Sequence, residues 1–523
     1  MGLRAVGHIG QSRDLASKSF SIDLDVALVA LFAIATFVLH IAVAGSYGYQ
    51  RDELYFISCA RHLAFGYVDQ PPLIAVVAKV ALALFGDSLY GLRLLPAVAA
   101  AATVVVTGRI TRRLGGGLFA QAIAMLGIAL APFYLAIGNL LTMNAFEPLL
   151  WVGAAYLFFK ANENDRPLTW VALGTVMGLG LINKYSMFFF IGSCVVAIAL
   201  SPERRSLLRP GSLVALAIAG AFVAPTLVWQ AGHGWPQLEV LRNAAADKNV
   251  VVGPPAFYAQ QILMMNPLAA PIWLTGLWSL LFAREGRPFR WYGIAYVLLS
   301  LTYLALGAKV YYLAPIYPVL FAAGAQLIEA RFGAWRPMVA LYPALLLLCG
   351  LAIAPEAFPL LPLPVFLKYE SVLDFRGIKM EKHPEGRVPQ HFADMLGWHK
   401  LVSTFASVYD ALPPDQQREA TILTRDYGQA SAINFFGPRY HLPRAISGHN
   451  TFYLYGPGDA SGKVVLAIGM SPAFLRGEFR SVRPVAVYHD DYVLPDFNNL
   501  TIYECTEPKR SLAAWWPATK RYI

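Results

Sequence analysis

The stretch GYQRDELYFISCARHLAFGYVDQPPL (residues 48–73) directly follows a strongly apolar run and is rich in ionisable side chains. Those side chains are Arg51, Asp52, Glu53, Arg61, His62 and Asp69. The spacing of residues 51–65 predicts an amphipathic helix at a membrane surface, which leads through Asp69 to the stiff Pro71-Pro72 elbow. So much charge needs an explanation if the surrounding chain spans a membrane.

The composition indicates a polytopic α-helical membrane protein. Of 523 residues, 57% are hydrophobic and 14% are charged, whereas soluble domains carry about 25% charged residues. The net charge of +10 does not predict a nucleic-acid partner, because the lysines and arginines lie in short loops between apolar runs and set the topology. The four cysteines form no CxxC pair, so zinc-type spacing is absent.

About eleven apolar runs are long enough to be read as membrane spans. They cover residues 25–46, 90–111, 118–137, 139–159, 168–183, 185–200, 211–230, 262–283, 291–308, 311–329 and 337–355. The apolar run Leu73–Phe85 is shorter and lies between Pro-Pro and Gly-Asp. We therefore expect this run to lie at the membrane interface or to dip into it.

The distribution of basic residues predicts one orientation for these spans. If the N-terminus is cytoplasmic, every cytoplasmic loop is basic and the opposite loops carry far less charge, as the positive-inside rule requires. The basic groups are Arg4, Arg13 and Lys18 at the N-terminus and then residues 112–113, 160–166, 202–209, 284–290 and 331–336. The stretch 48–73, the loop 232–261 and everything after about Pro355 then face away from the cytoplasm.

The chain is predicted to divide into two domains. Residues 1–355 form the membrane domain, with a first extracytoplasmic loop at 47–89. Residues 356–523 carry more charge, Pro-Pro turns and short alternating runs such as KVVLAIG (463–469) and NLTIYE (499–504). Such runs are typical of strands, so this part is expected to be a small extracytoplasmic α+β domain.

Two acidic positions in the opening stretch are the strongest candidates for chemistry. On the expected helix, Asp52 shares a face with Tyr55, and Asp69 follows just before the elbow. A membrane-surface helix with solvated charges is the alternative, but carboxylates gain nothing from anionic lipid and interfacial helices prefer Lys and Arg. We interpret the pair as a constructed site.

Other polar residues lie within or at the ends of the predicted spans. Asn144 and Glu147 are one turn apart, and a carboxylate at that depth indicates either a functional site or a hydrogen bond between helices. Lys184 and Lys309 lie at outer helix ends. In KVYYLAPIYP, Lys309 with Tyr311 and Tyr312 offers a mobile cation and phenol donors that suit a phosphate, although Lys309 could instead simply snorkel.

Three segments carry a family resemblance. DELYF followed by ARHLAFGYVDQPPL resembles the first periplasmic loop of the GT-C glycosyltransferases, in the bacterial branch that includes protein O-mannosyltransferase-like and aminoarabinose-transferase-like enzymes (glycosyltransferase family 39-like). KVYYLAPIYP resembles an element late in that membrane domain, and RDYGQASAINFFGPRYHLPRAISGHN (425–450) resembles the tail of bacterial members. The resemblance implies a multi-pass protein of the bacterial inner membrane and the cell envelope.

The resemblance also implies an activity and roles for individual residues. Such enzymes move a sugar from a polyprenyl-phosphate carrier to a lipid, glycan or protein acceptor outside the cytoplasm. Asp52 would be the general base, and Asp69 matches the second acidic position. The residues expected to bind substrate are Arg51, Glu53, Tyr55, His62, Gln70, Glu147, Lys184, Lys309, Tyr311 and Tyr312. The Glu-Lys-Pro-Pro of the aminoarabinose branch is replaced by Asp69-Gln70-Pro71-Pro72, so Lys184, Lys309 or an arginine must supply the charge for the phosphate.

The chemistry expected is a single displacement at the anomeric carbon with inversion, because one base and a phosphate leaving group suffice. No cofactor is required, although Asp52 and Asp69 could alternatively share a divalent cation. A flippase or transporter of lipid-linked sugars is the main rival function, with Asn144 and Glu147 lining its pathway. An envelope scaffold is a weaker rival, since it leaves the carboxylates unexplained.

Overall fold

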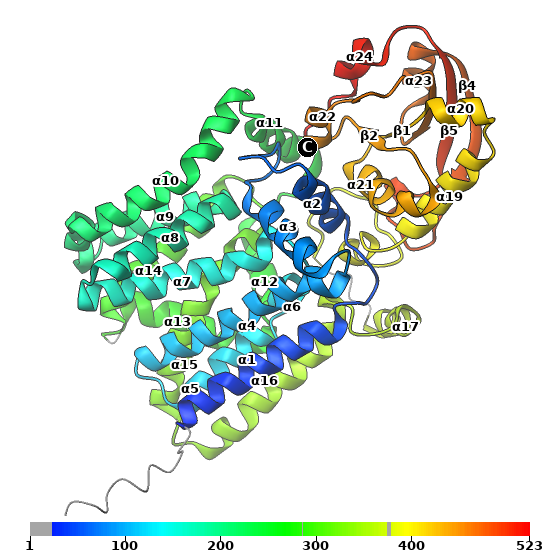
Figure 1. Ribbon diagram of the computed structural model, residues 1–523. Helices are drawn as coiled ribbons and strands as arrows, with labels where there is room; N and C mark the ends of the chain where they lie inside the picture. Colours follow the sequence, from blue (N-terminus) through cyan, green and yellow to red (C-terminus); the bar gives the residue numbers. More distant parts are fainter. Residues whose placement is uncertain (1–22, 285, 374–377) are drawn as a thin grey trace, which may run out of the picture.

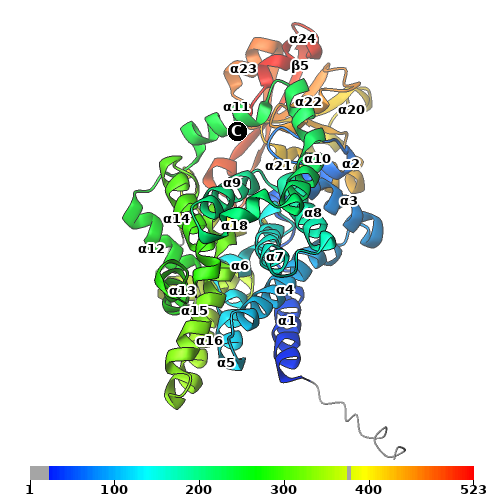
Figure 2. The same cartoon turned by 90° about the vertical axis from the view of Figure 1, so that its left-hand side faces the viewer.

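The structure is a computed structural model and describes residues 23–284, 286–373 and 378–523. Apolar helices form one part of the molecule, and a smaller domain with a sheet caps one end of them (Figures 1 and 2). The basic residues Arg4, Arg13 and Lys18 lie outside the described residues. The predicted fold class, a polytopic helical membrane protein with a C-terminal α+β domain, is confirmed.

The helices of the membrane part are α1 (Leu24–Val43), α4 (Leu89–Arg113), α5 (Leu118–Ala129), α6 (Pro132–Gly138), α7 (Met143–Asn164), α8 (Pro167–Asn183), α9 (Ser186–Ala199), η1 (Pro202–Leu208), α10 (Pro210–Gly232), η3 (Pro267–Ala269), α13 (Ala270–Phe282), η4 (Arg287–Phe289), α14 (Arg290–Ala305), η5 (Val310–Ile316), α15 (Tyr317–Phe332) and α16 (Arg336–Ala357). The connecting segments carry α2 (Arg51–Arg61), α3 (Leu73–Phe85), α11 (Pro236–Asn243), η2 (Ala244–Lys248), α12 (Pro254–Met264) and α17 (Leu363–Leu373).

The predicted count of eleven spans is not confirmed. Within the described part of the chain, five helices are long and apolar enough to cross a membrane, or up to seven if each bent pair counts as one span. The expected span at 118–137 is broken between α5 and α6 with a bend of 62°. Pro132 is the first residue of α6, and a proline disfavours a helical conformation for the residue before it.

The loops that carry the predicted cytoplasmic charges meet at one end of the helices. At the end of α4, Arg112 pairs with Asp25 at 3.0 Å, and Arg113 pairs with Glu163 at the end of α7. Gly117, at the start of α5, donates its backbone N–H to Glu329 near the end of α15. The C-terminal domain lies at the opposite end (Figure 1), as the alternation of basic loops predicts.

The C-terminal domain is built around a five-stranded mixed sheet with the order β2-β1-β3-β5-β4. β1 runs parallel to β2 and β3, while β5 runs antiparallel to β3 and β4. Both runs that were expected to be strands, 463–469 and 499–504, are strands in the structure. The elements are α18 (Gln390–Ala393), α19 (Trp398–Asp410), α20 (Pro414–Glu419), β1 (Ala420–Thr424), α21 (Tyr427–Phe436), η6 (Gly437–Tyr440), β2 (Ala445–Ser447), α22 (Thr451–Tyr455), β3 (Val464–Ile468), α23 (Pro472–Glu478), β4 (Phe479–Tyr488), η7 (Pro495–Phe497), β5 (Leu500–Pro508), α24 (Leu512–Trp515) and η8 (Trp516–Thr519).

Helix α2 lies between the two parts of the molecule (Figure 1). One hydrophobic cluster joins Leu54 and Ile57 of α2 to Ala430 and Ile433 of α21 and to Leu466 of β3. The helix expected at residues 51–65 is α2, which ends four residues earlier at Arg61. Every residue of α2 except Asp52 and Arg61 is buried, and α21 packs against it. The alternative of a helix whose charges are solvated is therefore wrong.

Candidate active site

The start of α2 is fixed by polar contacts that its own sequence provides. Gln50 is the N-cap: its side chain accepts from the backbone N–H of Asp52 at 2.7 Å, and its own N–H donates to Glu53 at 2.9 Å. This capping box satisfies N–H groups that a helix start leaves free. The Glu53 carboxylate also accepts two hydrogen bonds from the guanidinium of Arg93 in α4, at 3.0 and 2.8 Å.

Glu53 thereby ties α2 to the membrane helices. The side chains of Glu53 and Arg93 are both fully buried, and Glu53 also accepts from the backbone N–H of Leu141 at 2.9 Å. A buried carboxylate is costly unless it is paired and hydrogen-bonded, and here it is both. Glu53, which was expected to bind substrate, has its oxygens occupied by these protein groups.

Asp52 is the accessible carboxylate at the start of α2. Its side chain is 34% exposed, and its Oδ1 accepts a hydrogen bond from the hydroxyl of Tyr427 in α21 at 2.7 Å. Arg51 lies beside it, with Nε 3.7 Å from the same oxygen. Arg51 is buried and also pairs with Asp394 of the C-terminal domain at 3.7 Å. Although burial opposes a charge there, Asp394, Tyr427 and Asp52 raise the pKa of Arg51 well above its ordinary value.

Asp69, by contrast, has both carboxylate oxygens occupied. Oδ1 accepts from the hydroxyl of Tyr55 at 2.7 Å, and Oδ2 accepts from the side-chain amide of Asn450 at 2.9 Å. Burial raises the pKa of Asp69 to about 6, against hydrogen bonds that favour the charged form. The rings of Tyr55 and Tyr427 lie 4.5 Å apart, so the groups that hold Asp69 and Asp52 contact each other.

A second buried carboxylate, Asp426, fixes the start of α21. It accepts from the backbone N–H of Gly428 at 2.7 Å, and its Oδ2 lies 3.1 Å from Nδ1 of His449. Burial opposes the ionised form, but these contacts and the nearby charge of Arg51 lower the pKa of Asp426. Tyr427 follows directly in the chain, so this contact positions the hydroxyl that reaches Asp52.

The lysines expected at the phosphate site both have partners. Lys184, at the end of α8, donates to Glu147 at 2.8 Å and to Asn144 at 2.6 Å. Its Nζ lies 4.4 Å from the ring centroid of Tyr312 and 5.3 Å from that of Tyr311. The structure thus brings these five predicted residues together, and the hydrogen bonds between α7 and α8 match the structural alternative considered for Asn144 and Glu147.

Lys309 instead contacts Glu381, a residue that sequence reasoning did not single out. Its Nζ lies 2.5 Å from Oε1 of Glu381, and Lys248 lies 3.5 Å from the same oxygen. His383 contacts the other oxygen at 3.1 Å. Although burial opposes ionisation, His383 and both lysines lower the pKa of Glu381, with a further contribution from Arg51. Two cations and a histidine therefore converge on one carboxylate.

Two further predicted residues, His62 and Gln70, contact other groups than the carboxylates. The ring of His62 stacks near Tyr455 at 4.6 Å, and its Nδ1 lies 3.1 Å from the backbone oxygen of Ser58. Gln70 is buried and its side chain contacts Sγ of Cys59 at 3.6 Å. Their expected roles in substrate binding remain predictions.

The residues that sequence reasoning missed come mostly from the C-terminal domain. They are Tyr427, Asn450, Asp394, Asp426, His449 and Glu381, with Arg93 and Lys248 from the preceding part of the chain. Four of them flank or lie within the segment 425–450, whose resemblance to the tail of bacterial family members was recognised without assigning it a site. The polar pairs Asp426-Tyr427 and His449-Asn450 at the two ends of this segment were the sequence signal that could have marked it as part of the site.

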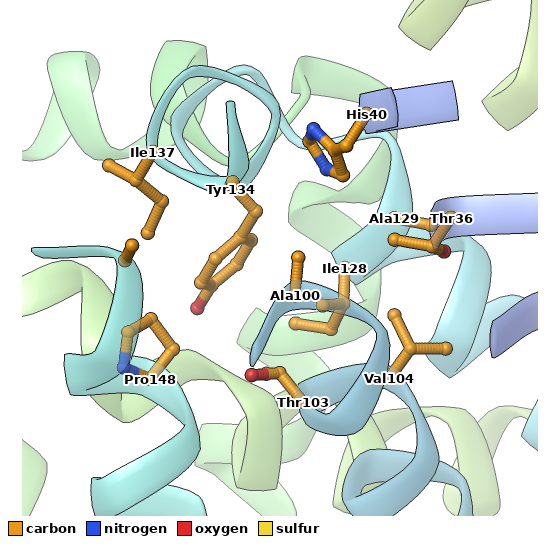
Figure 3. A pocket seen from close by; sticks show the side chains of 12 residues that line it. Thr36, His40, Ala100, Thr103, Val104, Ile128, Ala129, Tyr134, Ile137 and Pro148 are labelled. Atoms are coloured by element: carbon orange, nitrogen blue, oxygen red, sulfur yellow. The ribbon is translucent and has the colours of Figure 1, made fainter. Parts of the chain in front are cut away.

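Across residues 23–284, 286–373 and 378–523, no group of three or more His, Cys, Asp or Glu side chains could hold a metal ion. A cation shared by Asp52 and Asp69 alone stays a prediction. A small pocket between α1, α4, α5, α6 and α7 is lined by Thr36, His40, Thr103, Tyr134 and apolar side chains (Figure 3). No carboxylate or lysine lines this pocket.

Comparisons with known proteins agree with the motifs. The family described as dolichyl-phosphate-mannose-protein mannosyltransferase matches residues 69–229. The chain is 26% identical over 279 residues to the lipid A galacturonosyltransferase RgtD of Rhizobium johnstonii, and the match covers 50% of this chain and 56% of that protein. It is 28% identical over 213 residues to the lipopolysaccharide core galacturonosyltransferase RgtA of the same organism, with 39% and 41% covered. The chain thus spans about half the length of the curated relatives it matches.

A solved structure covers far more of the chain. ArnT from Cupriavidus metallidurans bound to undecaprenyl phosphate superposes with a TM-score of 0.58 and 16% identity, over 91% of this chain and 98% of that one. The apo state of the same protein gives the same TM-score. These findings confirm the resemblance that the motifs carried: the chain has the fold of the ArnT-like GT-C glycosyltransferases, with the C-terminal domain included in the match.

Proposed function

We propose that this protein is an inverting glycosyltransferase that moves a sugar from a polyprenyl-phosphate carrier to an envelope acceptor outside the cytoplasm. The observation that carries the proposal is the state of Asp52. It is a partly exposed carboxylate at the end of the apolar helices, beside the buried Arg51, whose charge also acts on Glu381, the partner of Lys248 and Lys309. Such a group can take a proton from an incoming hydroxyl while nearby cations stabilise a departing phosphate.

The reaction proceeds as one displacement. Asp52 removes the proton from the acceptor hydroxyl, and the acceptor oxygen forms a bond to the anomeric carbon. The bond from that carbon to the phosphate oxygen breaks, and polyprenyl phosphate leaves with the electron pair. One displacement inverts the anomeric configuration, whereas retention would need a nucleophilic carboxylate as well.

Two sites in the structure offer lysines as candidates for binding the carrier phosphate. Lys184 lies with Tyr311 and Tyr312, and Lys309 lies with Lys248. In both groups the lysine is already paired with a carboxylate, so a phosphate would compete with Glu147 for Lys184 or with Glu381 for Lys309 and Lys248. Lys309 and Lys248 share a single carboxylate, which makes them the better candidates for the carrier phosphate.

The relatives favour some substrates over others. ArnT was solved with undecaprenyl phosphate, which supports a polyprenyl-phosphate carrier here. RgtD and RgtA act on lipid A and on the lipopolysaccharide core, which favours a lipid or glycan acceptor over a protein. None of these comparisons supports the flippase alternative.

The test is transfer by the purified protein. We expect sugar to pass from a labelled polyprenyl-phosphate donor to a lipid A acceptor, with inversion at the anomeric carbon observed by NMR spectroscopy. Retention would contradict the single displacement. Movement of the intact donor across reconstituted vesicles, without transfer to any acceptor, would favour the flippase.

A further inference from the structure

Both candidate carboxylates lie in the membrane domain, yet each receives a hydrogen bond from the C-terminal domain. Tyr427 donates to Asp52 at 2.7 Å, and Asn450 donates to Asp69 at 2.9 Å. The two contacts join residues 375 and 381 positions apart in the chain. They are separate contacts made by opposite ends of the segment 425–450.

We propose that the C-terminal domain completes the active site, with Tyr427 positioning the base Asp52 and Asn450 holding Asp69 as a structural anchor. This inference rests on the proposed function. It assigns different roles to the two aspartates, Asp52 and Asp69. It makes the domain a part of the catalytic unit, because the membrane domain alone lacks both donors.

Tyr427 is rigidly placed. Asp426 caps the helix start in front of it through Gly428 and His449. The Tyr427 ring packs against Tyr55 at 4.5 Å, and the guanidinium of Arg51 lies 5.4 Å from its centroid. A hydroxyl held in this way can fix the orientation of a carboxylate without moving itself.

Asn450 is held equally firmly by the end of the chain. Its backbone has φ of 46° and ψ of −131°, a positive-φ conformation that few residues other than glycine adopt. Its backbone N–H donates to the carbonyl of Arg521 at 2.9 Å, and its side-chain oxygen accepts from the N–H of Ile523 at 3.0 Å. The remaining side-chain amide reaches Asp69, so the last residues of the chain help to place this donor.

The two carboxylates differ in what is left free for a substrate. Tyr55 and Asn450 occupy both oxygens of Asp69. Tyr427 occupies only Oδ1 of Asp52, and Oδ2 has no hydrogen-bond partner among the residues that the structure describes. A base must lie within hydrogen-bond reach of the hydroxyl that it deprotonates, and an oxygen without a hydrogen-bond partner is the more available for that contact. Asp52 offers such an oxygen and Asp69 does not.

The Tyr427 hydrogen bond has a consequence that a merely structural contact lacks. The hydroxyl of Tyr427 orients the carboxylate that reacts, whereas the carrier phosphate does not contact this group in the proposed reaction. Removing the hydroxyl with Tyr427→Phe should therefore leave the donor KM nearly unchanged. Loss of orientation should lower kcat by about tenfold to a hundredfold, the cost of a small misplacement of a reacting group.

The test compares Tyr427→Phe with Tyr453→Phe in the full-length protein. Tyr453 lies in α22 of the same domain, and its hydroxyl has no hydrogen bond to either carboxylate. We would measure kcat and the donor KM separately, together with thermal unfolding in detergent. We expect kcat to fall in Tyr427→Phe alone, with little change in the donor KM or in the unfolding temperature.

Each other outcome has a defined meaning. Equal kcat values for the two variants would overturn the role of Tyr427, as would a loss of activity that simply follows a loss of stability. If the wild-type protein transfers no sugar, the proposed function fails and this inference fails with it. An active wild-type protein with an unaltered Tyr427→Phe variant contradicts this inference alone.

Discussion

Asp52 and Asp69 show how surroundings divide the roles of two identical side chains. Asp52 keeps a third of its side chain exposed and one oxygen free of hydrogen bonds to the described residues. Asp69 has both oxygens hydrogen-bonded, and burial raises its pKa. The sequence pointed to both residues, because acidic side chains beside an apolar span are rare. It could not rank them, because their donors Tyr427 and Asn450 lie almost four hundred residues away in the chain.

The first prediction concerns the base. Asp52→Asn preserves the shape of the side chain but removes the proton acceptor, so kcat should fall by about 10²–10⁴-fold. The donor KM should change little, because the carrier phosphate does not contact this group in the proposed reaction. Steady-state kinetics with purified protein would measure both, and Asp87→Asn on the same loop serves as the control. Transfer near the wild-type rate would show that another group is the base.

The second prediction concerns the stability that depends on Asp69. Its pKa rises from 3.8 to about 6 in the folded protein, so the folded state holds the proton more tightly than the unfolded state. The resulting stabilisation is fully present below about pH 4 and is lost as the pH rises through about 6. Asparagine does not titrate, so the unfolding temperature of the wild type relative to Asp69→Asn should fall across this range. A difference that is constant with pH would mean that Asp69 is ionised throughout.

At the scale of elements, the hydrophobic patterns predicted where helices and strands lie, but they did not predict what packs against each element. The segment now seen as α2 was predicted from its periodicity, and its capping residues Gln50 and Glu53 are visible in the sequence. The packing of α21 against α2 was not predicted, because the two helices are far apart in the sequence. The breaks in the spans at Pro132 and Pro202 had a local signal in the prolines, whereas the angle of each bend depends on packing.

The third prediction concerns the loop that carries Glu381. If Lys309 and Lys248 bind the carrier phosphate, Glu381 competes with the donor for them. Lys309→Ala should raise the donor KM or lower kcat, whereas Glu381→Gln should lower the donor KM severalfold, since about 1 kcal/mol corresponds to a factor of about five. Donor-dependent kinetics would separate the two variants.

Glu419→Gln is the matched control for that experiment. Glu419 also pairs with a lysine, Lys463, but on an exposed surface of the C-terminal domain. A donor KM that rises in both Lys309→Ala and Glu381→Gln would show that their ion pair only holds the loop in place. The phosphate site would then be sought at Lys184.

For the whole molecule, composition and loop charges were enough to predict a membrane domain followed by an α+β domain. The sequence could not show that the two share one hydrophobic cluster, in which Leu54 of α2 and Leu466 of β3 both take part. A continuous apolar strand such as β3 (Val464–Ile468) indicates two buried faces, but it does not identify the partner of each face. That partner, α21 with α2 beneath it, is what brings the C-terminal domain to Asp52.

The last prediction tests the orientation of the whole molecule. The basic loops at the far end from the C-terminal domain indicate that this end is cytoplasmic, so the active site and the C-terminal domain should face outward. Single cysteines at the exposed positions Ala245, Ala513 and Ala334, in a background without the four native cysteines, report the two sides. Ala245→Cys and Ala513→Cys should react with a membrane-impermeant thiol reagent in cells whose outer barrier is permeabilised. Ala334→Cys, between α15 and α16, should react only after the inner membrane is broken. The reverse pattern would place Asp52 in the cytoplasm, where the proposed transfer to an envelope acceptor could not take place.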